Sequence, residues 1–468
     1  MLIFDADLVR RLKQSGPRYT SYPTADRFGA DFGAAQYAQA VLRARSLSDV
    51  APLSLYVHVP FCEQLCYYCA CNKIIAPDHA PAVKYLVYLE REIALQAARW
   101  GSRRRVGQLH FGGGTPTYLS DAQMDRLLAC LREHFDLAPD AEGEVSSEFS
   151  IEVDPRTVTP ARVAVLRRQG FNRISLGVQD FDPAVQKAVN RVQPHAQTQG
   201  VIDAARAAGF RSISIDLIYG LPLQSVASFG PTLDKVLAAR PDRIAIYHYA
   251  HMPRLFKSQN LIDAASLPDA EVKLAMLGLC IERLTAAGYV YIGMDHFALP
   301  DDELALSQRR GTLQRNFQGY STHADADMVA LGVSAISAVG ASYSQNEKTL
   351  AGYYARLDAG ELPIARGIAL DADDLLRRDV ISRLMCDFTL DFASLAIPGG
   401  AAAAVYFAAD LQRLAPLAEQ GLLTLHAGGI DVTPHGRVVI RNICMAFDRY
   451  LHAPLPEGPA APRHSNTV

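Results

Sequence analysis

The sequence contains no apolar run that approaches the roughly 18 residues of a membrane-spanning helix. Its first residues, MLIFDADLVRRLKQSGPRYTSYP, also lack the basic stretch followed by an apolar stretch that is typical of a secretory leader. Both absences argue against a membrane or export role. We therefore expect a soluble, cytoplasmic protein that has no membrane partner.

A strong excess of one charge is also missing. The formal net charge is −3, and the runs of like charge are short, as in Arg103 to Arg105. A nucleic-acid-binding surface would need clustered lysine and arginine, so we expect no nucleic-acid partner. Because no segment has an obvious coiled-coil pattern, a monomer is the default expectation.

Cysteine is sparse outside one short segment. Four of the eight cysteines lie within ten positions of the segment YVHVPFCEQLCYYCACNK: Cys62, Cys66, Cys69 and Cys71. The other four are isolated and are expected to be small buried hydrophobes: Cys130, Cys280, Cys386 and Cys444. A secreted disulfide framework would spread its cysteines over a small, loop-rich chain. One local cluster in a large cytosolic chain indicates metal or redox chemistry instead.

From Leu53 onward, short β-branched runs alternate with longer segments whose apolar residues have helical spacing. This alternation predicts an α/β fold with a parallel sheet. Several strands are apolar on both faces, as expected for a sheet that is covered by helices on one side and fills a barrel on the other. The predicted strands are LSLYVHV, QLHF, SIEV, RISLGVQ, SISIDLIY, RIAIYHYA and YVYIGM.

Polar or small residues follow the ends of four of these strands: Cys62, Gly112 to Thr115, Asp154 and Gln179. In barrel enzymes that rim is where the reacting groups are placed. We therefore predict a partial (β/α)6-type barrel with its site at the carboxyl ends of the strands.

At 468 residues the chain is longer than a typical single core, which predicts one large domain and a smaller one. We place an N-terminal segment that packs on the barrel at residues 1–50, the barrel at 51–355, a smaller C-terminal domain at 356–452 and a disordered tail at 453–468. Two helical patterns before a hairpin make the C-terminal domain mostly helical and winged-helix-like. Without a basic recognition helix, we expect this domain to pack on the barrel or act as a lid, and not to bind DNA.

The spacing CxxxCxxC places three thiolates, those of Cys62, Cys66 and Cys69, on one short loop. Four-cysteine zinc sites usually join two CxxC knuckles that are separated by about a dozen or more residues, and no second knuckle is present. Iron–sulfur clusters normally take four thiolates, so three ligands would leave one iron open to another molecule. A cluster or zinc ion that only braces the fold is the alternative.

The cysteine loop after the first barrel strand resembles that of the radical S-adenosylmethionine (SAM) superfamily. In that superfamily three cysteines bind a 4Fe-4S cluster, and the fourth iron chelates the amino and carboxylate groups of SAM. Further segments resemble superfamily segments that contact SAM: GGGTPT at Gly112 to Thr117, SIEVDP and IYGLP. Glycines at such a place let the backbone approach a ligand closely.

Within the superfamily, segments from about residue 15 to residue 452 are similar to the oxygen-independent coproporphyrinogen III oxidase family, also called coproporphyrinogen III dehydrogenases. The segments are SGPRYTSYPTA, CYYCACNK, GVQDF, IDLIYGLP, GMDHFA, RNFQGYST, GVSAIS and RNICMAFD. The related haem chaperones are the alternative. Their cysteine loop usually continues with Phe where Cys71 stands, and they lack the PRYTSYP segment.

The resemblance implies one 4Fe-4S cluster on Cys62, Cys66 and Cys69, with Cys71 left unligated. It also implies two bound SAM molecules. The first would contact Tyr56, Gly113, Glu152 and Ile336. The second would contact Tyr68, Gly114, Thr115, Gln179, Arg191, Asp216 and Ala250, with Tyr68 standing where the family commonly has Phe.

Simpler interpretations remain open for several of these positions. Glu152 and Asp216 at strand ends could cap helices, and Gln179 and Arg191 could be ordinary surface residues. The two aliphatic positions, 250 and 336, could belong to the core. Isolated histidines near strand ends, His58 and His296 among them, are expected to be hydrogen-bonded neighbours of the site and not metal ligands.

The family's reaction converts the ring A and ring B propionates of coproporphyrinogen III to vinyl groups, which gives protoporphyrinogen IX. A 5'-deoxyadenosyl radical made from SAM takes a hydrogen atom from the β-carbon of a propionate, and loss of carbon dioxide and one electron leaves the vinyl group. The sequence does not identify the electron donor, which would be a protein such as flavodoxin or ferredoxin. Because the substrate is a tetracarboxylate, guanidinium groups are expected near it, and Arg18 and Arg315 are the candidates.

Overall fold

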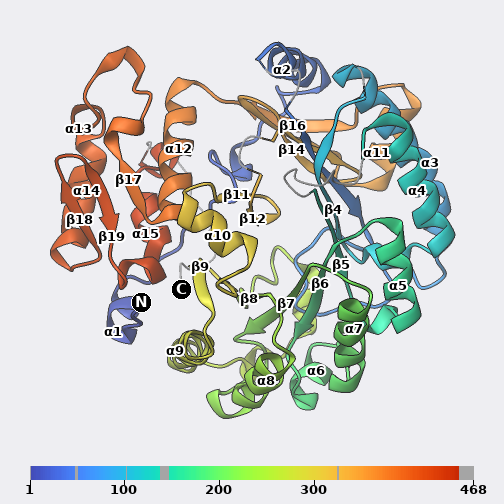
Figure 1. Ribbon diagram of the computed structural model, residues 1–468, viewed down its shortest axis with the longest axis horizontal. Coiled ribbons are helices and arrows are strands. Elements are labelled where there is room, and N and C mark those ends of the chain that lie inside the picture. The colour runs from blue at the N-terminus through green and yellow to red at the C-terminus, as the bar shows by residue number, and fades with distance from the viewer. Residues whose placement is uncertain (1, 48–50, 102, 138–146, 324–325, 453–468) are drawn as a thin grey trace.

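The computed structural model describes residues 2–47, 51–101, 103–137, 147–323 and 326–452 (Figure 1). The tail expected at 453–468 lies outside the described residues, as does part of the 1–50 segment. The largest element of the fold is a sheet of 12 strands, in the order β16-β15-β14-β13-β1-β4-β5-β6-β7-β8-β10-β9. Helices cover the outer side of its central strands, so the chain has the predicted α/β architecture.

Six consecutive strands of this sheet run parallel and form the barrel. They are β1 (Leu53–Val59), β4 (Val106–Gly113), β5 (Glu148–Val153), β6 (Arg173–Gln179), β7 (Ser212–Tyr219) and β8 (Arg243–His248). The helices between them are α3 (Ala80–Trp100), α4 (Asp121–His134), α5 (Pro160–Gln169), α6 (Pro183–Ala188), α7 (His195–Ala207) and α8 (Val226–Ala239). The order and direction of these elements confirm the predicted partial (β/α)6 barrel.

The barrel does not close, because each of its two edge strands pairs with a further strand of the sheet instead of with the other edge strand. Beyond β1 lie the parallel strand β13 (Met328–Leu331) and then the antiparallel strands β14 (Ile336–Ala338), β15 (Ser342–Asn346) and β16 (Ile364–Ala369). Beyond β8 lie the antiparallel strands β10 (His296–Ala298) and β9 (Val290–Gly293). The predicted strand YVYIGM is therefore β9, at an antiparallel edge and not in the barrel. The large sheet extends to Ala369, and the proposed domain limits stay a prediction.

Local sequence explains where the outer helices begin and end. Ser120 and Gln123 form a capping box at the start of α4, and Thr159 accepts a hydrogen bond from the amide of Arg162 at the start of α5. Helix α5 ends at Gly170, whose φ of 113° is costly for other residues. These caps fix where the helices start and end, and the chain then returns to the amino end of the next strand.

The inner face of the barrel is polar, which the sequence did not predict. Alternate strand residues point outward and are fully buried under the helices, as are Leu55, Ile151 and Ile215. The inward positions line a cavity of about 150 Å³ and include Gln108, His110, Glu148, Ser150, Arg173, Ser175, Ser212, Ser214 and Arg243. The apolar pattern of the strands comes from their outward face and rim. The lumen is thus a polar cavity and not a second apolar core.

The remaining elements lie at the rim and beside the barrel. These are α1 (Ala6–Arg11), α2 (Ala34–Leu47), β2 (Phe61–Cys62), β3 (Ile74–Ile75), α9 (Ala270–Ala286), α10 (Glu303–Arg310), β11 (Gln314–Asn316), β12 (Gly319–Ser321) and α11 (Leu350–Asp358). The C-terminal region contains α12 (Ala372–Asp387), β17 (Thr389–Asp391), α13 (Ala403–Tyr406), α14 (Ala408–Glu419), β18 (Leu423–His426), β19 (Gly429–Val432), α15 (Ile440–Met445) and α16 (Arg449–His452). Its three strands form a small antiparallel sheet in the order β17-β19-β18, on the left in Figure 1.

The C-terminal region holds the N-terminal segment through a set of side chains after α14. Arg441 donates from Nε to the carbonyl of Pro17 at 3.0 Å, and Tyr19 donates to Asp448 at 3.0 Å. The amide of Arg449 donates to the hydroxyl of Tyr22 at 3.1 Å. Segments more than 400 residues apart in the chain are therefore joined beside the barrel mouth.

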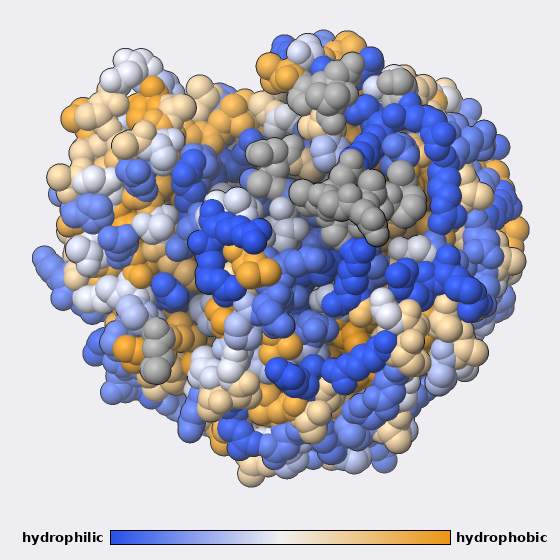
Figure 2. Space-filling view, in the orientation of Figure 1, coloured by the Kyte–Doolittle hydropathy of each residue, from blue (hydrophilic) through white to orange (hydrophobic). Residues whose placement is uncertain are grey.

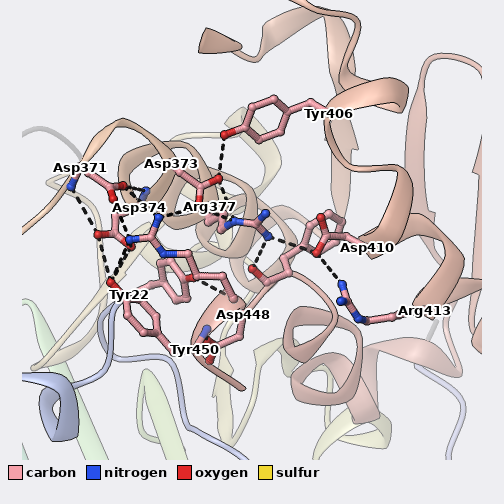
Figure 3. Close-up of polar contacts among 12 residues, drawn as sticks. Tyr22, Asp371, Asp373, Asp374, Arg377, Tyr406, Asp410, Arg413, Asp448 and Tyr450 are labelled. Atoms are coloured by element: carbon pink, nitrogen blue, oxygen red, sulfur yellow. Dashed lines mark hydrogen bonds and ion pairs between the residues drawn. The ribbon is translucent and has the colours of Figure 1, made fainter. Parts of the chain in front are cut away.

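Acidic residues at the start of α12 organise this junction (Figure 3). Arg449 pairs with Asp371, Asp373 and Asp374 at 2.8 to 3.0 Å. Arg377 bridges Asp373 at 2.9 Å and the buried Asp410 at 3.1 Å. Carboxylates in the first turn also suit the positive end of the α12 dipole. The network connects α12, α14 and α16.

Among the residues that the structure describes, none of the helices is both long and apolar enough to cross a membrane. On the face shown in Figure 2, hydrophobic residues occur in separate patches between hydrophilic ones.

Candidate active site

The cysteine loop leaves the barrel at the carboxyl end of β1. Strand β2 pairs with β3 and closes the loop, and the amide of Cys69 donates to the carbonyl of Cys66 at 3.2 Å. Neighbouring side chains hold the loop from outside, since Asn190 donates to the carbonyl of Leu65 at 2.8 Å and Ser258 donates to that of Cys69 at 3.1 Å. Cys62, Cys66 and Cys69 all line one cavity of about 520 Å³.

The donor set of this cavity fits an iron–sulfur cluster better than a single metal ion. In the described part of the chain, no group of three or more His, Cys, Asp or Glu side chains could hold one ion. The sulfurs are instead spread around a cavity, as a cluster of several irons requires. A side-chain hydrogen bond with Cys71 lowers the pKa of Cys69 to about 6. Burial opposes this shift and the charge of Lys73 adds to it. Burial raises the pKa of Cys62 to about 11. Cys71 is exposed.

Two arginines surround the sulfur of Cys66. Arg191 donates to it at 3.4 Å and Arg156 at 3.5 Å. Both also pair with the carboxylate of Asp154, at 3.0 and 2.7 Å. Arg191 donates in addition to the carbonyl of Gly177 at 2.6 Å. Arg191 is buried beside a ligand candidate, so its interpretation as a surface residue is wrong.

The glycines at the end of β4 allow the backbone to pack against the cysteine loop. A Cβ on Gly113, whose φ is 116°, would lie 2.7 Å from the ring of His58, and one on Gly114 would lie 2.7 Å from the carbonyls of Pro60 and Phe61. The hydroxyl of Thr115 donates to the sulfur of Cys62 at 3.4 Å. The glycine triplet thus serves the close approach of two strand ends as well as any approach to a ligand.

Two carboxylates stand at the opposite wall. Glu152 accepts from the ring of His110 at 3.1 Å and from the amide of Gly113 at 3.2 Å, and Asp216 accepts from Ser175 at 3.3 Å. Burial and then the charge of Glu152 raise the pKa of Asp216 to about 7. Burial opposes the ionised form of Glu152, but His110 outweighs it and lowers the pKa. Neither side chain caps a helix, so that interpretation is wrong for both.

Most of the residues predicted to bind SAM line the cavity of about 520 Å³: Tyr68, Gly113, Gly114, Thr115, Glu152, Gln179, Arg191 and Asp216. Gln179 adopts a φ of 67°, and its Oε1 is buried without a hydrogen-bond partner, as expected of a group that awaits a ligand.

Three predicted residues lie outside the lining of this cavity. Tyr56 stacks on His110 with ring centroids 5.8 Å apart and bonds to His58 at 3.0 Å. The carbonyl of Ala250 accepts from Gln259. Ile336 packs against the apolar cluster of Phe28, Tyr343 and Leu370.

Arg156 is a site residue to which the sequence assigned no role, and Asp154 was predicted at the barrel rim without a specific contact. The signal was present, because both follow β5 in the segment SIEVDPR, where the rim of the barrel was expected. Arg156 matters because it contacts Cys66, which is 90 positions away in the chain, and Asp154 matters because it pairs with Arg156 and Arg191.

The two nominated arginines stand together at the mouth of the barrel. Arg18 forms an ion pair with Asp295, and its guanidinium lies 5.8 Å from the ring of Tyr247. Arg315 lies 4.8 Å from the ring of Tyr320, and its Nε and Nη1 are buried without hydrogen-bond partners. Burial and the charge of Arg315 lower the pKa of Arg18. Unpaired guanidinium donors at this depth suit an anionic ligand.

Comparisons with known proteins place the site in a family context. The family described as the radical SAM superfamily matches residues 56–236, and the HemN C-terminal domain family matches residues 370–439. The chain is 50% identical over 448 residues to the oxygen-independent coproporphyrinogen III oxidase of Pseudomonas aeruginosa, and the alignment covers 96% of each chain. The Escherichia coli oxidase of the same name is also 50% identical over 448 residues, with 96% of each chain covered.

A solved structure gives the same result. The E. coli coproporphyrinogen III oxidase (HemN), described as a radical SAM enzyme, has a TM-score of 0.90 and 48% sequence identity. The match covers 96% of this chain and 99% of that chain.

Proposed function

The chain belongs to the oxygen-independent coproporphyrinogen III oxidase family, and from this membership we propose how its own residues serve the reaction. It is a radical SAM oxidoreductase of porphyrin and haem biosynthesis, which uses a 4Fe-4S cluster and SAM. The reaction is the oxidative decarboxylation of the ring A and ring B propionates of coproporphyrinogen III to vinyl groups. The haem-chaperone alternative is not supported by the relatives, which are named as oxidases.

Cys62, Cys66 and Cys69 hold the cluster, and Cys71 does not. When bound, the cluster supplies the electron that cleaves SAM reductively to a 5'-deoxyadenosyl radical. The observation that carries this assignment is that the loop cysteines line one cavity together with the SAM-binding candidates. Cys71 lines the cavity too, but it is exposed and bonds to Cys69. Arg191 and Arg156 place positive charge beside the sulfur of Cys66.

Two SAM molecules bind in and next to this cavity. The first contacts Gly113 and Glu152, with Tyr56 and Ile336 at its edge. The second contacts Tyr68, Gly114, Thr115, Gln179, Arg191, Asp216 and Ala250. On this wall, the acceptors for the ammonium and hydroxyl groups of SAM are the unpaired Oε1 of Gln179 and the carboxylates of Glu152 and Asp216.

The substrate enters with its carboxylates directed to Arg18 and Arg315. The buried, unpaired donors of Arg315 support this role, because they need an acceptor that the described protein atoms do not provide. The radical takes a hydrogen atom from the β-carbon of a propionate. The carboxylate then leaves as carbon dioxide and one electron passes to an acceptor, so that the vinyl group remains.

The electron donor is a small redox protein such as flavodoxin or ferredoxin, and the enzyme works as a cytoplasmic monomer. Neither proposal affects the assignment of the site.

The test is an anaerobic turnover assay on reconstituted protein. Iron and sulfide should each be about four per chain. With SAM, a reductant and coproporphyrinogen III, the protein should release 5'-deoxyadenosine and carbon dioxide. Tight haem binding without decarboxylation would contradict the enzyme assignment. Arg18→Ala should raise KM for coproporphyrinogen III, and an unchanged KM and turnover would remove Arg18 from the substrate site.

A further inference from the structure

A separate cavity of about 270 Å³ opens at the barrel rim, between α1, α9 and the ends of β7 and β8. We call it the rim pocket. Its lining consists of Val9, Arg10, Lys13, Tyr219, His248, Pro268, Asp269, Ala270, Glu271, Lys273 and Leu274. None of these residues lines the cavity of the three cysteines.

Lys273 is held in place in this pocket. Its aliphatic stem packs over Gly220, where an added Cβ would lie 3.2 Å from Cε of the lysine. The residue is half-buried, and burial together with the charge of Lys13 lowers its pKa. A lysine whose stem is fixed and whose ammonium faces a cavity is suited to binding an anion.

Neither lysine of the pocket has an ion-pair partner among the described residues. The two carboxylates of the pocket lie close enough for charge interactions with the lysines, but the hydrogen bonds that they accept come from other groups. Asp269 accepts from the amide of Val272 at 2.9 Å, and Glu271 accepts from Nε of Arg10 at 2.8 Å. The ammonium groups of Lys13 and Lys273 therefore remain available to a ligand.

The rim pocket is connected with the barrel through shared walls. Tyr219 and His248 also line an adjoining cavity that contains Arg18 and Arg441. That cavity shares Phe297 with the polar lumen, and the lumen shares Glu152, Ser175 and Asp216 with the cavity of the cysteines. These cavities thus form a row in which neighbours share wall residues, and the adjoining cavity is the smallest of them, at about 40 Å³.

The charges along this row are mainly positive at its outer end. Burial and the cations Lys273, Arg18, Arg441 and Lys13 lower the pKa of His248 to about 3, so this histidine is neutral. Of the carboxylates, Asp295 is already paired with Arg18. An anionic ligand there gains from all of these cations.

We propose that the rim pocket binds a propionate group of the substrate that is not being converted, through Lys273 and Lys13. This inference rests on the proposed function, because the proposed substrate carries four carboxylates and converts only two of them. The reacting propionate must reach the cysteine cavity. Since the two cavities share no lining residue, the carboxylate at Lys273 belongs to another ring of the same macrocycle.

The test uses coproporphyrin III, the stable oxidised form of the substrate, which carries the same four propionates but does not react. Its binding to the reconstituted protein is followed by fluorescence under anaerobic conditions. Lys273→Met should raise Kd about tenfold, the loss expected for one charge-assisted hydrogen bond. Lys273→Arg should restore most of the affinity, and the more exposed Lys13→Met should raise Kd about threefold.

Matched controls distinguish a contact between Lys273 and a carboxylate from a general effect of losing a lysine. Lys84→Met, on the outer helix α3, should leave Kd unchanged, since Lys84 lines none of these cavities. The tetramethyl ester of coproporphyrin III has no carboxylates, so Lys273→Met should not affect its binding. The affinity for SAM should also stay the same.

Protoporphyrin IX keeps only the two propionates that the reaction spares. Lys273→Met should weaken its binding as much as that of coproporphyrin III. An effect on coproporphyrin III alone would overturn the assignment to a spared propionate. Unchanged Kd values for both lysine variants, or an equal loss with the ester, would overturn the pocket itself. Failure of the proposed function is a different result, because the wild-type protein would then release no carbon dioxide.

Discussion

The guanidinium of Arg191 lies 3.4 Å from the sulfur of Cys66. The nitrogen that makes this contact, Nη1, also donates to Asp154 at 3.0 Å, and Nη2 donates to the carbonyl of Gly177 at 2.6 Å. One buried side chain thus joins the cysteine loop to the ends of β5 and β6. A single planar guanidinium therefore positions both the proposed cluster ligand Cys66 and the wall of the proposed SAM site.

Replacing this arginine should affect the SAM site more than cluster assembly. In Arg191→Met the three thiolates remain, and Arg156 still pairs with Asp154 at 2.7 Å. Iron and sulfide should stay at about four per chain, while Kd for SAM rises about tenfold or more. Metal analysis and equilibrium SAM binding measure the two effects. Arg168→Met, on the exposed face of α5, should change neither. Loss of iron in the Arg191 variant would contradict this division of roles.

Cys71→Ser should still assemble the cluster. Cys71 lines the cavity but is exposed, and the three other cysteines of the loop line the cavity as well. Reconstituted Cys71→Ser protein should contain about four irons per chain, as the unmodified protein does. Cys69→Ser, two positions away, should lose most of its iron. If instead Cys71→Ser cannot assemble a cluster, Cys71 is a ligand.

Tyr85 joins the end of β1 to the turn before β14. Its buried hydroxyl donates to the carbonyl of His58 at 2.7 Å and accepts from the amide of Val333 at 3.1 Å. Tyr85→Phe leaves both groups unsatisfied and should lower the free energy of unfolding by about 1–3 kcal/mol. Urea unfolding would measure this loss in the free energy of unfolding, and the m-value should stay unchanged. Tyr88→Phe is the control, because the hydroxyl of Tyr88 donates to exposed Asp358 at 3.1 Å. Its loss should cost less than about 0.5 kcal/mol. Equal costs for the two variants would disprove the prediction.

Glu92 makes stability depend on pH. It is fully buried in α3 and accepts from Gly332 at 2.7 Å, Asn346 at 2.6 Å and Tyr353 at 2.6 Å. Burial outweighs these donors and raises the pKa of Glu92 from 4.5 to about 7. Between these values the folded chain keeps a proton that the unfolded chain releases, so stability falls as the pH rises.

The size of this effect is on the order of 3 kcal/mol between about pH 4.5 and pH 7. Glu92→Gln cannot titrate and should show a flatter dependence over the same range, measured by urea unfolding at several pH values. Glu133→Gln, on α4, is the control and should keep the wild-type slope. A slope that is the same in the Glu92 variant would show that other groups cause the dependence.

Arg377 should be a main stabiliser of the C-terminal region. It bridges Asp373 and the buried Asp410 and donates to the carbonyl of Phe447 at 2.9 Å (Figure 3). Arg377→Met should destabilise by about 3 kcal/mol, because it leaves buried carboxylate groups less compensated. Arg413 also pairs with Asp410, but its side chain is 38% exposed, so Arg413→Met should cost less than about 1 kcal/mol. Thermal unfolding followed by circular dichroism compares them, and a larger loss for Arg413 would be contrary to this account.

Local patterns predicted much of the fold and part of the site. The alternation of strands and helices gave the right barrel, because hydrophobic periodicity and capping act over a few residues. It did not predict the polar lumen, since a strand's outward and inward faces can be distinguished only when its neighbours are known. It also did not assign β9 to an antiparallel edge, because strand direction depends on where the chain returns.

The spacing of Cys62, Cys66 and Cys69 on one loop was sufficient by itself to indicate a cluster with an open position. Thiolate chemistry is a local property of that loop. Only the tertiary structure decided that Arg156 and Arg191 contact Cys66 and that Arg18 and Arg315 meet at the barrel mouth. It also decided that Lys273 lines the rim pocket. These residues are tens to hundreds of positions apart, and their charges act on one another only because the barrel places the carboxyl ends of its parallel strands around one cavity.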